Sequence, residues 1–322
     1  MEHQSRDSSG TGLPGTGRNS VLHTSTTGRW KTVLRIARHL LACVTVGISI
    51  ASNAASAMPD TVKFSSLDAS TTLTAYLFKP SAPGPWPAVV MMHGRSGPYS
   101  SAAKGKYTAA TLSQRHKMWG EFWAARGYAA LLVDSFGPRG HPGGFAAGTY
   151  KERPTDVNEQ RVRPLDAYGA LAWLRTRGDV IPDRIGLQGW SNGAMATLAI
   201  VATRPLEFKT PFNTATMANA FRAALAFYPG CNAQRNTDWK PYAPLVMMVA
   251  SKDEEVSPVT CRRLAEEVKK RGADAGFEFI WYEGAQHAFD DPGKARQAVP
   301  ANRTATEDAM KRAGAFFARE LK

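Results

Sequence analysis

The chain has 322 residues and carries a formal net charge of +13 at pH 7. A basic balance of this size raises the question of nucleic-acid binding, but no Lys/Arg-rich run with interleaved aromatic residues accompanies it. The short run Lys269-Lys270-Arg271 is typical of the solvated end of a helix. We therefore expect no nucleic-acid partner.

The first 57 residues have the layout of a targeting segment. Residues 1–28 are polar, rich in Ser, Thr and Gly, and lack a periodic apolar pattern, which predicts disorder. Four basic residues then precede an uncharged apolar run from Leu40 to Ala51, and small residues follow up to Ala57. This order predicts a secretory signal peptide cleaved near Ala57, and therefore a protein that is periplasmic or secreted. The run has 12 residues, fewer than the roughly 20 of a spanning helix, so a stable membrane anchor is the weaker alternative and a lipoprotein site at Cys43 is weaker still.

The remainder, residues 58–322, has the size of one large α/β domain, and we expect a single catalytic domain there. Because the leader holds six basic and two acidic residues, its removal lowers the formal charge from +13 to +9. Cys231 and Cys261 then remain as an even pair in an oxidising compartment, which favours a disulfide between them. Two buried free thiols are the alternative.

Short β-rich runs alternate with longer helical patterns along this domain, as in a mostly parallel sheet covered by helices on both faces. Eight strands are predicted, at 62–65, 72–78, 88–92, 129–133, 184–188, 223–227, 245–250 and 277–282. Apolar residues at three and four spacing predict helices at 112–125, 162–176, 192–203, 258–271 and 304–321. Two long irregular stretches, 95–111 and 135–161, each follow a strand. Both should therefore project from the carboxyl edge of the sheet, where such sheets bind ligands.

One motif carries the chemistry of a nucleophile. Residues 184–188 form a predicted strand, Gly189-x-Ser191-x-Gly193 follows, and a predicted helix begins directly afterwards. A tight turn from strand to helix exposes a serine at the carboxyl edge, and glycines flank it where the backbone approaches too closely for a Cβ. A structural glycine turn is the alternative, but the strand and helix on either side favour Ser191 as a nucleophile.

A serine hydroxyl needs a histidine to take its proton, and the histidine needs a carboxylate to fix its tautomer. In this arrangement the chain order is serine, acid, histidine. His287 is the only histidine after Ser191, and it follows the last predicted strand, although a surface histidine is the alternative. Asp253 directly follows the preceding strand and is the preferred acid.

Other carboxylates compete with Asp253 for the role of the acid. Glu254 and Glu255 compete by proximity, and a solvated acidic turn is the alternative reading of this segment. Asp290 and Asp291 are expected to be surface charges.

A tetrahedral intermediate also needs two preorganised N–H donors. The backbone amide of Asn192, the residue after the nucleophile, is one candidate. The second should come from the loop after the strand 88–92, where the backbone amide of Arg95 is the candidate. His93 is interpreted as a residue that shapes this loop rather than as a second base.

Several motifs occur in order between Ala88 and Phe317: His93-Gly94-Arg95-Ser96-Gly97, Val133-Asp134-Ser135-Phe136 with Arg139-Gly140, Gly189-Trp190-Ser191-Asn192-Gly193, Phe227-Tyr228-Pro229-Gly230-Cys231, Asp253 and His287-Ala288-Phe289. Together they resemble the dienelactone hydrolase family of α/β-hydrolases, in its exported branch. The resemblance implies a catalytic triad of Ser191, Asp253 and His287. The founding enzymes of the family use a cysteine nucleophile and a glutamate near the oxyanion loop, and this chain has neither.

The resemblance also implies that Arg139 can hold a substrate carboxylate, with a turn-stabilising salt bridge as the alternative. Trp190 is a second candidate substrate contact, with core packing as its alternative. We expect a serine hydrolase of small carboxylic esters that needs no metal and no organic cofactor, with lactones left open. A peptidase or an acyltransferase could use the same triad, and a non-catalytic binding protein could keep the fold. Nothing in the sequence predicts the oligomeric state.

Overall fold

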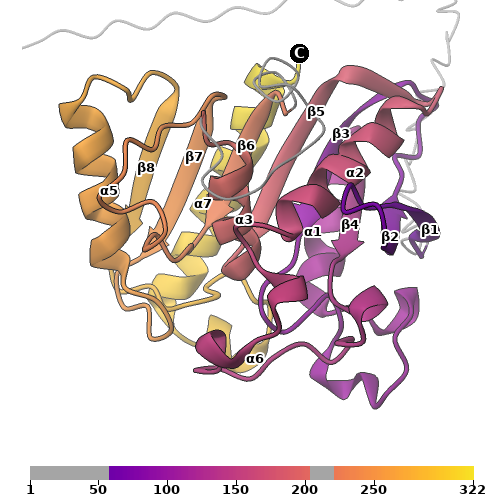
Figure 1. Ribbon diagram of the computed structural model, residues 1–322, viewed down its shortest axis with the longest axis horizontal. Helices are drawn as coiled ribbons and strands as arrows, with labels where there is room; N and C mark the ends of the chain where they lie inside the picture. Colours follow the sequence, from indigo (N-terminus) through magenta and orange to yellow (C-terminus); the bar gives the residue numbers. More distant parts are fainter. Residues whose placement is uncertain (1–57, 204–220) are drawn as a thin grey trace, which may run out of the picture. The chain divides into compact units, whose positions relative to one another are not determined.

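The computed structural model describes residues 58–203 and 221–322, which belong to one compact unit. The predicted leader, with its cleavage position near Ala57, lies outside the described residues. Eight strands of the described chain form one sheet in the order β1-β2-β4-β3-β5-β6-β7-β8 (Figure 1). They are β1 Asp60–Ser65, β2 Thr72–Phe78, β3 Trp86–Met92, β4 Ala129–Asp134, β5 Val180–Trp190, β6 Ala223–Phe227, β7 Leu245–Ala250 and β8 Phe277–Tyr282.

The sheet is mostly parallel, as predicted. β2 pairs antiparallel with both β1 and β4, and every other neighbouring pair is parallel. The carboxyl ends of β3 to β8 therefore meet at one edge. This strand order and the helices around it are those of the expected α/β-hydrolase fold.

Helices cover both faces of the sheet. They are α1 Gln114–Ala124, α2 Arg163–Arg175, α3 Asn192–Ile200, α5 Pro258–Lys270, α6 Lys294–Gln297 and α7 Pro300–Glu320. The side chains of α2, α3 and α5 join one buried cluster, and those of α1 and α7 join the other. In Figure 1, α3 lies in front of the sheet and α7 behind it. Successive residues of β3 alternate between the two clusters, which is why this strand is a continuous apolar run in the sequence.

The boundaries of some elements differ from the prediction for local reasons. β5 begins at Val180, before the predicted 184. The prediction missed its first half because exposed polar residues there interrupt the apolar pattern. α7 begins at Pro300, four residues before the predicted start, since a proline fits the first turn of a helix. α3 ends at Ile200, three residues before the predicted end. The two long irregular stretches contain only short 3₁₀ turns.

No helix in the described ranges, 58–203 and 221–322, is long and apolar enough to cross a membrane.

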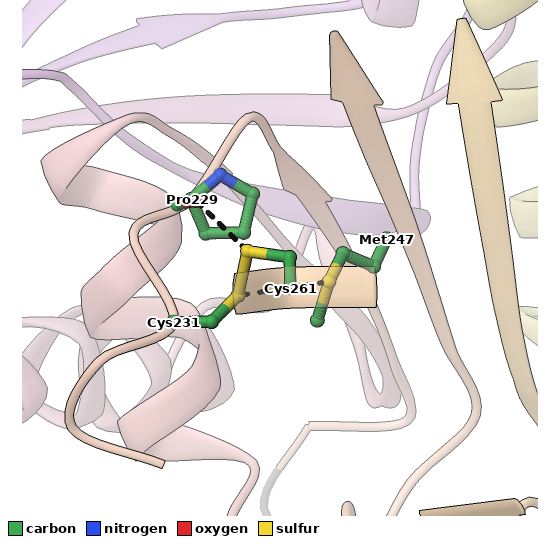
Figure 2. The surroundings of a disulfide bond; sticks show 4 residues. All are labelled: Pro229, Cys231, Met247 and Cys261. Atoms are coloured by element: carbon green, nitrogen blue, oxygen red, sulfur yellow. Dashed lines mark hydrogen bonds between the residues drawn. A yellow bond between two sulfur atoms is a disulfide. The ribbon is translucent and has the colours of Figure 1, made fainter. Parts of the chain in front are cut away.

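A disulfide joins Cys231 and Cys261, as the sequence predicted (Figure 2). It connects the loop after β6 to the first turn of α5. The bond is buried, with the sulfur of Cys261 lying 3.1 Å from the carbonyl oxygen of Pro229 and that of Cys231 lying 3.9 Å from the sulfur of Met247. Since neither sulfur carries a hydrogen, these are packing contacts. The bond braces the segment between β7 and α5.

Replacing both cysteines by alanine is expected to lower the free energy of unfolding by about 3 to 4 kcal/mol. The bond closes a loop with a sequence separation of 30 residues, and closing a loop of that length removes this much chain entropy from the unfolded state. Urea unfolding of the double variant and of the oxidised parent measures the difference. Because Asp253 lies in the braced segment, kcat should fall as well. Unchanged ester turnover in the double variant would show that the disulfide does not affect the position of Asp253.

Candidate active site

Ser191 occupies a sharp turn between β5 and α3. Its backbone has φ 51° and ψ −116°, a conformation that non-glycine residues rarely adopt. A strained serine between a strand and a helix is the geometry of a nucleophile elbow. The turn holds the side chain at the carboxyl edge of the sheet, where it is 7% exposed.

Two glycines make this turn possible. A Cβ on Gly193 would lie 2.0 Å from the carbonyl oxygen of Met92, and a Cβ on Gly189 would lie 2.3 Å from the carbonyl oxygen of Gly193. Neither position can hold a side chain without moving the backbone. The motif is therefore required by packing between β5, α3 and β3.

His287 lies within hydrogen-bond distance of both other side chains of the expected triad. The Ser191 Oγ is 3.0 Å from His287 Nε2, and His287 Nδ1 is 2.8 Å from Asp253 Oδ2. A carboxylate can only accept, so the imidazole proton belongs on Nδ1 and Nε2 is free to accept from the serine. The other Asp253 oxygen accepts the backbone N–H groups of Glu255 and Val256, both at 2.9 Å.

The competing carboxylates have other partners. Glu254 accepts the backbone N–H of His287 at 3.0 Å and pairs with Arg296. Glu255 forms a two-pronged ion pair with Arg95, with both N–O distances 2.7 Å. The Arg95 guanidinium holds the pKa of the Glu255 carboxyl below its usual value. Glu255 Oε2 nevertheless lies 3.7 Å from His287 Nε2, so a carboxylate borders the reaction centre on the side away from Asp253.

Two backbone amides are the candidates for holding an oxyanion. The amide of Asn192 opens α3, and a Cβ on Gly94 would lie 3.4 Å from the Cβ of Ser191, so the loop that carries Arg95 packs against the nucleophile. Within the described chain, neither the Asn192 nor the Arg95 amide donates to a protein group. Free amides at this place can receive a developing negative charge.

His93 fixes the direction of the Arg95 amide. Its Nε2 accepts the backbone N–H of Ser135 at 3.2 Å, so its proton lies on Nδ1, which is 2.7 Å from the carbonyl oxygen of Gly94. The C=O and N–H of a planar trans peptide point in opposite directions, so holding the Gly94 oxygen orients the Arg95 N–H. The interpretation of His93 as a loop-shaping residue agrees with these contacts.

Two buried histidines should make the protein less stable in acid. Burial, together with Arg163, holds the pKa of His93 well below 6.5, and burial with Arg115 lowers the pKa of His116 to about 3. Below pH 6.5 these histidines bind protons in the unfolded chain but stay neutral in the folded protein. The free energy of unfolding therefore decreases as the pH is lowered below 6.5, and above pH 6.5 the two histidines do not change it. Urea unfolding at pH 7 and pH 5 should show a loss of about 2 kcal/mol from His116 alone. A His116→Gln variant should lose correspondingly less, and an equal loss would exclude His116 as the cause.

Arg139 and Trp190 both have buried protein partners. The Arg139 guanidinium pairs with Asp68 at 2.7 Å and with Asp166 at 2.8 Å, and its side chain is 5% exposed. The salt bridge that was the alternative for Arg139 is thus the contact observed. The Trp190 indole is fully buried and donates to Asp290 at 2.8 Å, which matches its core-packing alternative.

The expectation that Asp290 is a surface charge is wrong. Asp290 is fully buried and accepts three hydrogen bonds from aromatic side chains. Its position between Phe289 and Asp291 gave no periodicity from which burial could be predicted. The ion pair of Arg95 with Glu255 was also missed, because it joins residues that are 160 positions apart.

A cavity of about 720 Å³ lies beside the loop after β3, and Ser191, Asp253 and His287 are not among the residues that line it. It is lined by Ser96 and Gly97 of the oxyanion loop, by the first turns of α1 including Arg115, and by residues 291–293 after His287. It is large enough for a small ester. Among residues 58–203 and 221–322, no group of three or more His, Cys, Asp or Glu side chains could hold a metal ion.

Residues 73–321 match the model of the dienelactone hydrolase family. Esterase 2 of Thermogutta terrifontis with bound propionate is similar in structure, with a TM-score of 0.52 and 21% identity over 79% of this chain and 93% of that chain. A Klebsiella pneumoniae protein named as a dienelactone hydrolase has a TM-score of 0.54 and 18% identity over 80% of this chain and 99% of that chain. YtaP of Bacillus subtilis, named as a hydrolase, is 30% identical over 123 residues, which are 38% of this chain and 41% of YtaP. The match therefore spans less than half the length of YtaP.

Proposed function

Because the chain belongs to the dienelactone hydrolase family and is a hydrolase, we propose that it cleaves carboxylic esters through an acyl-enzyme on Ser191. The observation that carries the proposal is the line of contacts from Ser191 Oγ through the His287 ring to Asp253, with distances of 3.0 and 2.8 Å. A histidine within reach of the serine and a carboxylate on its far nitrogen activate a hydroxyl without a metal or an organic cofactor.

In the first half of the reaction, Ser191 Oγ attacks the ester carbonyl carbon while its proton moves to His287 Nε2. The resulting oxyanion is held by the backbone N–H groups of Asn192 and Arg95. The imidazolium then gives the proton to the leaving alcohol as the C–O bond breaks. In the second half, His287 takes a proton from water as the water oxygen attacks the acyl carbon. The imidazolium then returns the proton to Ser191 Oγ as the acyl–Oγ bond breaks and the carboxylic acid leaves.

Small esters are the substrates to test first. Structures of Thermogutta terrifontis esterase 2 are described with propionate and with butyrate bound, and the cavity lined by Ser96 and Gly97 of the loop after β3 has room for acyl groups of that size. A panel of short and long acyl esters, lactones and peptide amides assigns the class. Turnover of esters with little or no turnover of amides supports an esterase, and preferred cleavage of amides favours a peptidase.

Covalent labelling separates an enzyme from a binding protein. A fluorophosphonate probe should label the wild-type chain at Ser191, because its phosphorus reacts only with an activated hydroxyl. Absence of labelling in folded protein would favour the non-catalytic alternative. Transfer of the acyl group to an added alcohol in preference to water would favour an acyltransferase.

We further propose that the protein is exported and acts in the periplasm or outside the cell. The charge and apolar pattern of residues 29–57 supports this, and so does the disulfide between Cys231 and Cys261, a bond that persists in oxidising compartments. Cell fractionation and sequencing of the mature N-terminus test the proposal. A mature chain that begins near Met58 outside the cytoplasm supports it, and an uncleaved chain in the cytoplasm would contradict it.

A further inference from the structure

A buried carboxylate lies beside the proposed triad. Asp290 Oδ2 accepts the indole N–H groups of Trp119 and Trp190, both at 2.8 Å, and Asp290 Oδ1 accepts the hydroxyl of Tyr228 at 2.5 Å. No described Lys, Arg or His forms an ion pair with Asp290. The nearest linked cation, Arg115, donates to the Tyr228 oxygen at 3.3 Å. Arg115 also interacts electrostatically with the Asp290 carboxylate, but all three direct hydrogen-bond donors are neutral. A fully buried carboxylate without a direct ion pair is costly to desolvate.

Two of the three donors adjoin the residues of the proposed triad. Trp190 immediately precedes Ser191 in the chain. The Tyr228 ring packs edge-on against the His287 ring, with centroids 4.8 Å apart. Asp290 itself follows His287 by three residues. The carboxylate thus connects the strand that ends at the nucleophile to the loop that carries the base.

Backbone strain gathers around the same carboxylate. Six non-glycine residues of the described chain have positive φ, and three of them are Ser191 at 51°, Tyr228 at 40° and Ala288 at 54°. Such conformations persist only where the surroundings over-determine them. Asp290 accepts a hydrogen bond from Trp190, the neighbour of Ser191, and another from the side chain of Tyr228. It also follows Ala288 by two residues. Its hydrogen bonds are therefore placed to hold all three turns.

We propose that Asp290 is a positioning residue that sets the separation of Ser191 Oγ from His287 Nε2 by tying both of their backbone segments to one buried carboxylate. This inference rests on the proposed function. A carboxylate suits the task because it accepts on both oxygens and needs no acceptor of its own. Burial holds the pKa of Tyr228 well above its usual value, so its hydroxyl keeps its proton and remains a donor.

The first test compares Asp290→Leu with Asp290→Asn. Leucine has a similar size and accepts nothing, so the Ser191 to His287 geometry should relax. The fluorophosphonate labelling rate and kcat should each fall about 10²-fold, with KM changed less than about twofold. Asparagine can still accept both indoles and can donate to the Tyr228 oxygen, so its losses should stay within about fivefold. Recovery by asparagine shows that geometry matters more than the charge.

The second test replaces each of the three hydrogen-bond donors to Asp290 in turn. It remains informative if Asp290→Leu fails to fold, as judged by circular dichroism. Trp190→Phe, Tyr228→Phe and Trp119→Phe each remove one hydrogen bond to Asp290. The first two donors adjoin catalytic groups, whereas Trp119 comes from α1. Labelling should slow about tenfold in Trp190→Phe and Tyr228→Phe, and less than about threefold in Trp119→Phe.

Each outcome is decisive because the probe needs only an activated serine. No labelling of the wild type overturns the proposed function itself. A labelled wild type with equal slowing in all three phenylalanine variants, or with none, overturns the positioning role of Asp290. So does a folded Asp290→Leu variant that reacts at the wild-type rate, or an Asp290→Asn variant that is as slow as leucine.

Discussion

Ser191→Ala should lower kcat/KM for a good ester by at least about 10³-fold, with little change in the free energy of unfolding. The loss follows from removal of the hydroxyl that attacks the carbonyl, and the triads of other serine hydrolases lose at least this much when one member is removed. Among the described residues, Ser191 Oγ makes one hydrogen bond, to His287, and the alanine methyl fits the space of the serine side chain. Steady-state turnover of a chromogenic ester measures the effect.

His287→Ala supplies the matched comparison. Its loss should be as large, and the double variant should be no slower than either single variant, because the two side chains act as one unit. Losses that multiply in the double variant would mean that Ser191 and His287 work independently, and the triad would be wrong. Residual turnover in Ser191→Ala should keep the wild-type KM within a few-fold, since only the attacking hydroxyl has been removed.

Much of the fold could be predicted because local patterns of apolar and polar residues determine its strands and helices. β3, β4 and β7 are buried on both faces and appear as unbroken apolar runs. The polar start of β5 broke the pattern, and its boundary was missed accordingly. A candidate nucleophile and a candidate base could be named because the fold fixes their order, and the sequence has one Gly-x-Ser-x-Gly motif and one later histidine.

The rest depended on contacts between distant segments, which no periodicity encodes. Arg139 could not be separated from a substrate ligand until Asp68 and Asp166, 71 and 27 residues away, were found against it. Asp290 lies in a segment without a periodic pattern, and its burial is decided by Trp119 and Tyr228 from other parts of the chain. In each case charge and spacing permitted two readings, and only tertiary packing separated them.

Asp253→Asn should lower kcat by about 10³ to 10⁴-fold, by analogy with the same exchange in other serine triads. The structure supplies a specific reason. Asp253 Oδ1 accepts two backbone N–H groups, from Glu255 and Val256, so the amide oxygen of an asparagine would settle there. Its NH₂ group would then face His287 Nδ1 and donate to it. That hydrogen bond places the imidazole proton on Nε2, the nitrogen that must accept the proton of Ser191.

Glu254→Gln tests whether the right acid has been chosen. The Glu254 carboxylate binds the backbone N–H of His287 rather than its ring, and a glutamine oxygen can accept that bond equally well. The loss in kcat should therefore stay below about fivefold, and KM should be unchanged. Equal losses in Glu254→Gln and Asp253→Asn would transfer the orienting role to Glu254. Wild-type turnover in Asp253→Asn would show that the tautomer of His287 is set without a carboxylate on Nδ1, leaving the Glu255 carboxylate, 3.7 Å from Nε2, as the charge that faces the imidazolium.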